Sequence, residues 1–228
     1  MDGVVVPAHD VELVVARTPG RLVAKAPVPH DCVVVMDDAT SLSGHALARA
    51  VAVLDQQPSV GTVFIATDEK TRDGVQPGHR WLRLAATHGP DLEGSRCAVL
   101  RRSTFEAAGK QRLGTRSGEL SLWLRAAALA DVAHVVEPLR QVLESSSRHL
   151  PVAVGEATEL HERALAFREL LDGFAPVRGQ SRLRSAVYRD LARCARRRAW
   201  VAAYEGDPVE SSLCRHLARD VNRWRRQG

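Results

Sequence analysis

The chain has 228 residues, of which 45% are hydrophobic and 26% charged, an ordinary globular composition that excludes a disordered or collagen-like chain. Its apolar runs are shorter than the roughly 20 residues of a membrane helix, and no basic stretch followed by an apolar one opens it. We therefore expect a cytoplasmic protein. Four cysteines without a CxxC pair argue against a disulfide framework or a cysteine zinc site.

The net charge of +5 is unevenly distributed. Residues 178–228 hold 13 arginines and 5 acidic residues, whereas the rest of the chain has a small acidic excess. This pattern indicates a basic C-terminal segment, and no nucleic-acid partner is expected. The segment can contact an anionic membrane or a lipid-linked acceptor, or it can be a solvated helix face. Its aromatic residues suit packing against the body, a second copy or a partner protein equally well.

Short β-branched runs near the start of the chain predict buried strands. Each ends close to Pro, Gly or Asp, as buried parallel strands often do. These runs are Val4–Val6, Val11–Ala16 and Cys32–Met36. After the third, apolar residues recur at helical spacing behind Ser43 as an N-cap, and Val60–Ala66 then predicts another strand. Strand, helix and strand in this order form a βαβ unit, which indicates an α/β sheet.

The next part of the chain alternates between polar segments and regular elements. Residues 67–95 are predicted to be a long loop with some regular structure around Trp81–Ala86. Cys97–Leu100 predicts a strand, and Ser103 is predicted to cap the helical turn that follows it. A convincing helix has its apolar face at Leu120, Trp123, Leu124 and Ala127, and Val132–Val136 predicts a last strand.

The sequence becomes helical from Glu156 onward. The last helix is predicted to bury one apolar face, formed by Leu213, Leu217, Val221 and Trp224. We therefore divide the chain into an α/β domain at residues 1–150 and a helical extension at residues 151–228, which is basic from residue 178.

Two groups of residues have the strongest chemical potential. Asp37 and Asp38 directly follow the strand Cys32–Met36, at the carboxyl end of a strand, where open α/β sheets bind ligands. Carboxylates suit Mg²⁺ or Mn²⁺, and such an ion can bridge to a diphosphate. The alternative is an acidic turn that caps the next helix. Glu119 lies in the first turn of the helix that contains Leu120 and Trp123, where it can be a general base or a charge stabilised by the helix dipole.

The order of these segments resembles the family-2 glycosyltransferases, which have the GT-A fold. Cys32–Val63 resembles the strand, helix and strand around their acidic motif. Cys97–Leu139 resembles their acceptor side, where Glu119 precedes Trp123-Leu124-Arg125 and an apolar strand runs into Glu-Pro-Leu. Val4–His9 resembles their opening strand. The resemblance implies a GT-A-like, Rossmann-like sheet that is mixed but mostly parallel, flanked by helices and followed by a helical extension.

The resemblance also implies a reaction and a role for each residue. A sugar would pass from a nucleotide diphosphate-sugar to an acceptor hydroxyl, with inversion at the anomeric carbon. Glu119 would be the catalytic base. Asp37 and Asp38 would hold Mg²⁺ or Mn²⁺ at the diphosphate, and the other donor-binding residues would be Pro7, Ala8, His9 and Lys25.

Two other functions remain open. Only 36 residues precede the acidic pair, so the nucleotide-binding half is shorter than the family pattern. A relative that has lost donor binding would act as a scaffold or partner subunit. A nucleotide-binding protein of another class, such as a nucleotidyltransferase, would use the two aspartates for a different displacement.

Overall fold

The computed structural model describes residues 22–24, 32–36, 44–66, 73–89, 97–109, 116–136, 156–178 and 180–227. The elements of the first part are β1 (Leu22–Ala24), β2 (Cys32–Met36), α1 (Gly44–Gln56), β3 (Val60–Ala66), β4 (Gly74–Gln76), α2 (Gly78–His88), β5 (Cys97–Arg101), α3 (Arg102–Ala108), α4 (Arg116–Leu129) and β6 (Asp131–Val136). The helices that follow are α5 (Glu156–Gly173), α6 (Ala175–Arg178), α7 (Ser181–Tyr204) and α8 (Pro208–Arg226). The strands predicted at Val4–Val6 and Val11–Ala16 lie outside the described residues.

The described strands form one mixed sheet in the order β1-β2-β5-β3-β6-β4. The pair β3–β6 is parallel, and the other four neighbouring pairs are antiparallel. The prediction of a mostly parallel sheet is therefore wrong for these strands. The βαβ unit itself is confirmed, because β2 and β3 point the same way with α1 between them in the chain. The two strands are not neighbours, since β5 lies between them and runs in the opposite direction.

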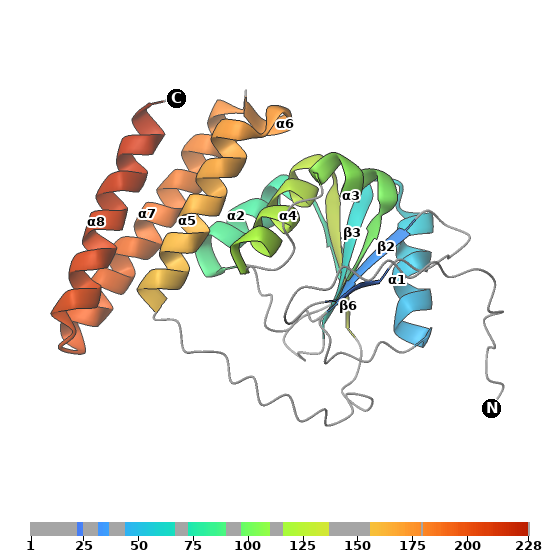
Figure 1. Ribbon diagram of the computed structural model, residues 1–228, viewed down its shortest axis with the longest axis horizontal. Coiled ribbons are helices and arrows are strands. Elements are labelled where there is room, and N and C mark those ends of the chain that lie inside the picture. The colour runs from blue at the N-terminus through green and yellow to red at the C-terminus, as the bar shows by residue number, and fades with distance from the viewer. Residues whose placement is uncertain are drawn as a thin grey trace.

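Alternating side chains of the central strands divide the interior into two cores. Val34 and Val63 face α1, and Val35 and Phe64 face the helices on the other side of the sheet. Figure 1 shows α1 on one side of the sheet and α2 and α4 on the other. Both faces are covered, which explains why the strands are apolar runs without alternating polar residues. The fold is therefore an α/β sheet flanked by helices.

The polar segment after β3 contains more regular structure than the sequence predicts. It includes the edge strand β4 and the helix α2, which buries Trp81, Leu82, Ala85 and Ala86. Gly78 begins α2 where the helix meets the end of α4. A Cβ atom at Gly78 would lie 1.9 Å from the carbonyl oxygen of Ala127, so only glycine fits.

Helix α4 is buried on more than one side. The predicted face of Leu120, Trp123, Leu124 and Ala127 is buried, and so are Ser121, Leu122 and Ala126. The helix is enclosed because the sheet and α2 lie against one part of its surface and α5 covers another. The Trp123 indole contacts the Phe64 ring edge to face, with the ring centroids 5.2 Å apart, and the Trp81 ring stacks on Phe64 at 5.6 Å. These three aromatic side chains form the centre of this core.

Helices α5, α7 and α8 form a bundle that packs on α2 and α4 (Figure 1). Phe167, Tyr188 and Val221 of the bundle belong to the same buried cluster as Phe64. Of the alternatives that the sequence left open, the structure shows the last helices packed against the body. Leu213 is an exception, because its side chain is 56% exposed and the buried face of α8 follows Cys214, Leu217, Ala218 and Val221 instead. The predicted division at residue 150 lies outside the described residues.

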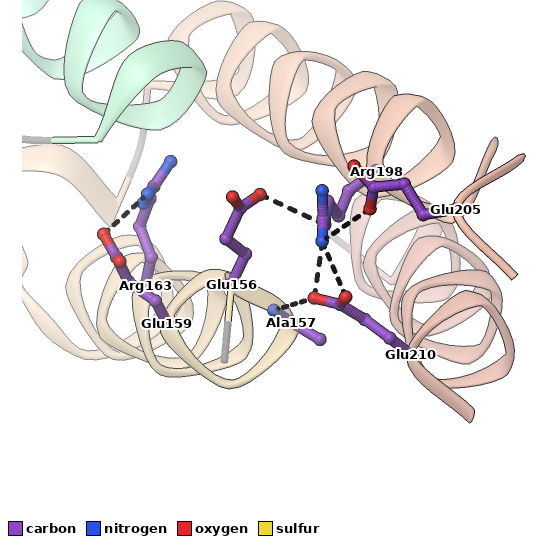
Figure 2. Close-up of polar contacts among 7 residues, drawn as sticks. All are labelled: Glu156, Ala157, Glu159, Arg163, Arg198, Glu205 and Glu210. Atoms are coloured by element: carbon purple, nitrogen blue, oxygen red, sulfur yellow. Dashed lines mark hydrogen bonds and ion pairs between the residues drawn. The ribbon is translucent and has the colours of Figure 1, made fainter. Parts of the chain in front are cut away.

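Arg198 joins the ends of three helices (Figure 2). Its guanidinium lies 2.7 Å from Glu210 of α8, 3.1 Å from Glu156 of α5 and 3.3 Å from Glu205 after α7. Glu210 also accepts a 3.0 Å hydrogen bond from the backbone N–H of Ala157, one of the first amides of α5, which have no partner within the helix. The group fixes the start of α5 against the hairpin of α7 and α8.

The variant Glu210→Gln is expected to be about 1 kcal/mol less stable than the unmodified protein at pH 7 and equally stable in acid. Hydrogen bonds from Arg198 hold the pKa of the Glu210 carboxyl below its usual value. Because the pKa is lower in the folded protein than in the unfolded chain, the carboxylate stabilises the fold at pH values above the unfolded-state pKa. This stabilisation is lost as the pH falls through the folded-state pKa. Urea unfolding in a series of buffers from pH 7 down to about pH 2 follows the difference between the two proteins as the carboxyl becomes protonated.

The control for this test is Glu162→Gln. Glu162 lies on α5 and makes no ion pair with a described residue, so its replacement should change stability little at either pH. A Glu210→Gln deficit that stays the same over the whole pH series would show that the carboxylate charge contributes nothing.

Candidate functional site

The three strands β2, β3 and β6 end at the same edge of the sheet. Met36 pairs with Cys97, the first residue of β5, and Ile65 pairs with the same residue from the other side. Ala66, at the end of β3, pairs with Val136, at the end of β6. This carboxyl edge is where α/β sheets bind ligands.

A polar group closes the part of this edge next to β6. The Arg49 guanidinium of α1 donates a 2.8 Å hydrogen bond to the carbonyl oxygen of Val136 and lies 2.5 Å from the Asp73 carboxylate. Asp73, which precedes β4, accepts a 2.7 Å hydrogen bond from the backbone N–H of Val136. The Arg49 and Asp73 side chains are 32% and 56% exposed, so the group is open to solvent. It fixes α1, β4 and β6 to one another at the rim of the candidate site.

Helix α4 begins toward the same edge. Ala127, late in α4, lies beside Gly78. Gly78 comes two residues after Gln76 of β4, and Gln76 pairs with Val132 near the start of β6. Its earlier residue Trp123 contacts Phe64, close to the end of β3. The helix therefore runs from the carboxyl edge back toward the opposite one. Glu119 belongs to the first turn of α4, so its backbone is located at the carboxyl end of the sheet.

Most of the predicted site residues fall on parts of the chain that the structure leaves undescribed. Pro7, Ala8, His9, Lys25, Asp37 and Asp38 all lie outside the described residues. In the sequence Asp37 directly follows Met36, and Met36 is the last residue of β2, which ends at the carboxyl edge. For Glu119 the structure gives the helix position and not the side chain. The roles of these seven residues remain predictions.

Trp123, Arg101 and Arg125 belong to the segment that resembles the acceptor side, and each makes contacts within the fold. Trp123 is 3% exposed and belongs to the core. Arg101 donates to the carbonyl oxygens of Leu54, Gln57 and Val60, so its guanidinium satisfies the end of α1. Arg125 lies 2.5 Å from Glu169 of α5 and donates a long, 3.5 Å hydrogen bond to the carbonyl oxygen of Ala108 in α3. Arg101 thus joins β5 to the end of α1, and Arg125 joins α4 to α3 and α5.

A divalent cation would need its ligands from the aspartate pair. Two adjacent carboxylates are hard oxygen donors and match Mg²⁺ or Mn²⁺ in chemical type. Within the described residues no three His, Cys, Asp or Glu side chains come together as a metal site.

Sequence reasoning did not identify Arg49 and Asp73. Asp73 lies in a polar segment with several other charges, and Arg49 is one of several polar positions on an amphipathic helix. The one local signal is Asp73-Gly74, a pair of residues typical of turns, at the entry to β4. The partner of each residue is distant in sequence, which leaves no local pattern to detect.

Comparisons of the chain with family models, with curated proteins and with solved structures gave no significant match. Among the helices that the structure describes, none combines the length and the apolar character needed to cross a bilayer.

Proposed function

We propose that the chain is a glycosyltransferase of the family-2, GT-A type, which transfers a sugar from a nucleotide diphosphate-sugar to an acceptor hydroxyl with inversion. One observation carries this proposal. The strand that precedes Asp37 and Asp38 ends at the carboxyl edge of the sheet, and the helix whose first turn contains Glu119 begins toward the same edge. Two separate carboxylate positions at one sheet edge are what a donor site and an acceptor base require.

The spacing of the strands is compatible with this division of roles. β2 and β3 are separated by β5, so about 10 Å lies between the strand that leads to the aspartates and the strand under α4. A diphosphate bound after β2 and a hydroxyl activated near α4 could therefore lie on two sides of one sugar. Attack on the face opposite the leaving diphosphate gives inversion.

In this mechanism each part of the chain has one task. The Glu119 carboxylate accepts the proton of the acceptor hydroxyl as its oxygen attacks the anomeric carbon. The bond from that carbon to the diphosphate oxygen breaks, and the nucleoside diphosphate leaves. Asp37 and Asp38 would hold a divalent cation, which offsets the charge of the leaving group. The Arg49–Asp73 contacts keep the rim of the site in place.

A thermal-shift experiment tests donor binding. Nucleoside diphosphates at about 100 times their dissociation constant should stabilise the protein by about 2.7 kcal/mol, and only when Mg²⁺ or Mn²⁺ is present. Asp38→Asn should abolish most of this gain. Asp220→Asn, which removes a carboxylate from α8, should leave it unchanged. If no nucleotide and cation together raise the melting temperature, the chain binds no donor, and a partner-subunit role becomes the better explanation.

A further inference from the structure

The hairpin of α7 and α8 has an inner side against the bundle and an outer side against solvent. The two helices are antiparallel. Ser211, near the start of α8, donates a 2.8 Å hydrogen bond to the carbonyl oxygen of Ala199 near the end of α7, and Arg184, near the start of α7, donates one to the carbonyl oxygen of Trp224 near the end of α8. Tyr188, Leu191 and Ala195 of α7 are buried in the same cluster as Leu217 and Val221 of α8. The outer side is the part of the hairpin that these contacts leave uncovered.

Arginines occupy one row on the outer side of each helix. In α7 the arginines of the row are seven residues apart, and in α8 they are four and seven residues apart. Residues at these spacings lie on the same side of a helix. Together the rows form what we call the arginine face: Arg182, Arg189 and Arg196 of α7 with Arg215, Arg219 and Arg226 of α8. All six residues are exposed.

The two rows lie on the same surface of the hairpin. Successive residues of a helix are about 100° apart around its axis. Around the axis of α7, the side that carries Arg198 faces α5, the next side carries Ala199 and faces α8, and the side after that carries the row of Arg196. Around α8, Glu210 faces α5, Ser211 comes next and faces α7, and the row of Arg215 follows. Both rows therefore lie beside the line between the helices, on the side away from α5.

The charges of this face are not neutralised by described residues. None of the six arginines makes an ion pair there, whereas the inner Arg184 and Arg198 contact carboxylates at 2.6 and 2.7 Å. Successive arginines of a row are four or seven residues apart, which is about 6–10 Å along the helix axis. This spacing is close to the Debye length of about 8 Å at physiological salt, so the repulsion between the arginines is only partly screened. An extended anionic surface would relieve that repulsion.

Two exposed aromatic residues continue the α7 side of the hairpin beyond Arg196. Trp200 is 70% exposed and Tyr204 is 85% exposed, and their rings stack with centroids 6.0 Å apart. Tryptophan and tyrosine rings have an apolar body and a polar group, and they favour the headgroup region of membranes. A basic surface that ends in such a pair matches the chemistry of an anionic bilayer surface.

We propose that the arginine face binds the surface of an anionic phospholipid bilayer, with the arginines at lipid phosphates and Trp200 and Tyr204 in the headgroup layer. The face is two helices wide, about 20 Å, so it does not enter a DNA major groove of about 12 Å, whereas a planar lipid surface accommodates both helices. This inference goes beyond the glycosyltransferase proposal and does not depend on it.

Co-sedimentation with vesicles tests the proposal on the full chain. The protein should bind phosphatidylcholine vesicles containing about one third phosphatidylglycerol, bind pure phosphatidylcholine vesicles far less, and detach as salt is raised. Arg196→Gln and Arg215→Gln should each lower the partition coefficient about fivefold, and the double variant about thirtyfold. Arg80→Gln, an exposed arginine of α2 without an ion pair to a described residue, should change it little.

A second readout uses the tryptophans. Trp81 and Trp123 are buried and Trp224 is partly buried, so quenching by brominated acyl chains should come mainly from Trp200 and disappear in Trp200→Phe. Equal binding to neutral vesicles, equal losses in Arg80→Gln and Arg215→Gln, or no vesicle binding would overturn the proposal. Arginine-dependent binding to an oligonucleotide without vesicle binding would also overturn it and assign the face to nucleic acid.

Discussion

Glu119→Gln is expected to lower sugar transfer by about 10²- to 10⁴-fold while the protein stays folded. Glutamine keeps the size of the side chain and most of its hydrogen bonds, but it cannot accept the proton of the acceptor hydroxyl. The loss of one charge in the first turn of α4 should cost only about 0.3–1 kcal/mol of stability. Transfer rates with a nucleotide-sugar donor and thermal melting of the same sample measure both quantities.

Two comparisons separate this role from a structural one. Donor binding by Glu119→Gln should stay close to that of the unmodified protein, because in the proposed mechanism the base contacts the acceptor and not the diphosphate. Glu106→Gln, on the exposed side of the neighbouring helix α3, should leave transfer unchanged. If transfer continues at the normal rate in Glu119→Gln, or if that variant unfolds, Glu119 is a residue of the helix terminus and the reaction has another base.

Trp123→Ala is expected to destabilise the protein by about 3–5 kcal/mol. The indole is 3% exposed and contacts Phe64 at the centre of the core shared by the sheet and the helical bundle. Truncation would leave a cavity between the sheet, α2 and α4. A chain of this size should lose roughly 2–4 °C of melting temperature for each kcal/mol, so calorimetry detects the change easily.

The chain contains a matched control for this substitution. Trp200→Ala removes the same side chain from a position that is 70% exposed, and its effect on stability should remain within about 0.5 kcal/mol. If Trp123→Ala melts at the same temperature as Trp200→Ala, the indole of Trp123 is not packed in the core and could instead line a substrate cleft.

The elements that could be predicted are those with a strong local pattern. Cys32–Met36 is a continuous apolar run and Val60–Ala66 is one interrupted only by Thr62, and such runs form strands when a sheet is covered on both faces. The helix beginning at Gly44 has four apolar residues at helical spacing, and all but Leu47 are buried. The position of the acidic pair, directly after β2, follows from the first of these strands alone.

The sheet order could not be predicted, because pairing between strands depends on residues far apart in the chain. β5 inserts between β2 and β3, and no local feature of Cys97–Arg101 indicates that it runs opposite to both. The roles of Arg49 and Arg101 depend on carbonyl oxygens of distant segments. Leu213 shows that helical spacing does not fix which apolar residues are buried. It comes four residues before Leu217, but its side chain lies just beside the buried face of α8 and is exposed.

The insertion of β5 also has a consequence for the order of folding during synthesis. A chain made only as far as Ala66 contains both strands of the βαβ unit, but β2 and β3 have no strand between them to complete the hydrogen bonds. The sheet closes only after Arg101 has left the ribosome, and it does so through contacts of long sequence separation, which form slowly. Until then, two apolar strands with unpaired edges are open to aggregation, so chaperone binding is expected to matter most at this stage of synthesis.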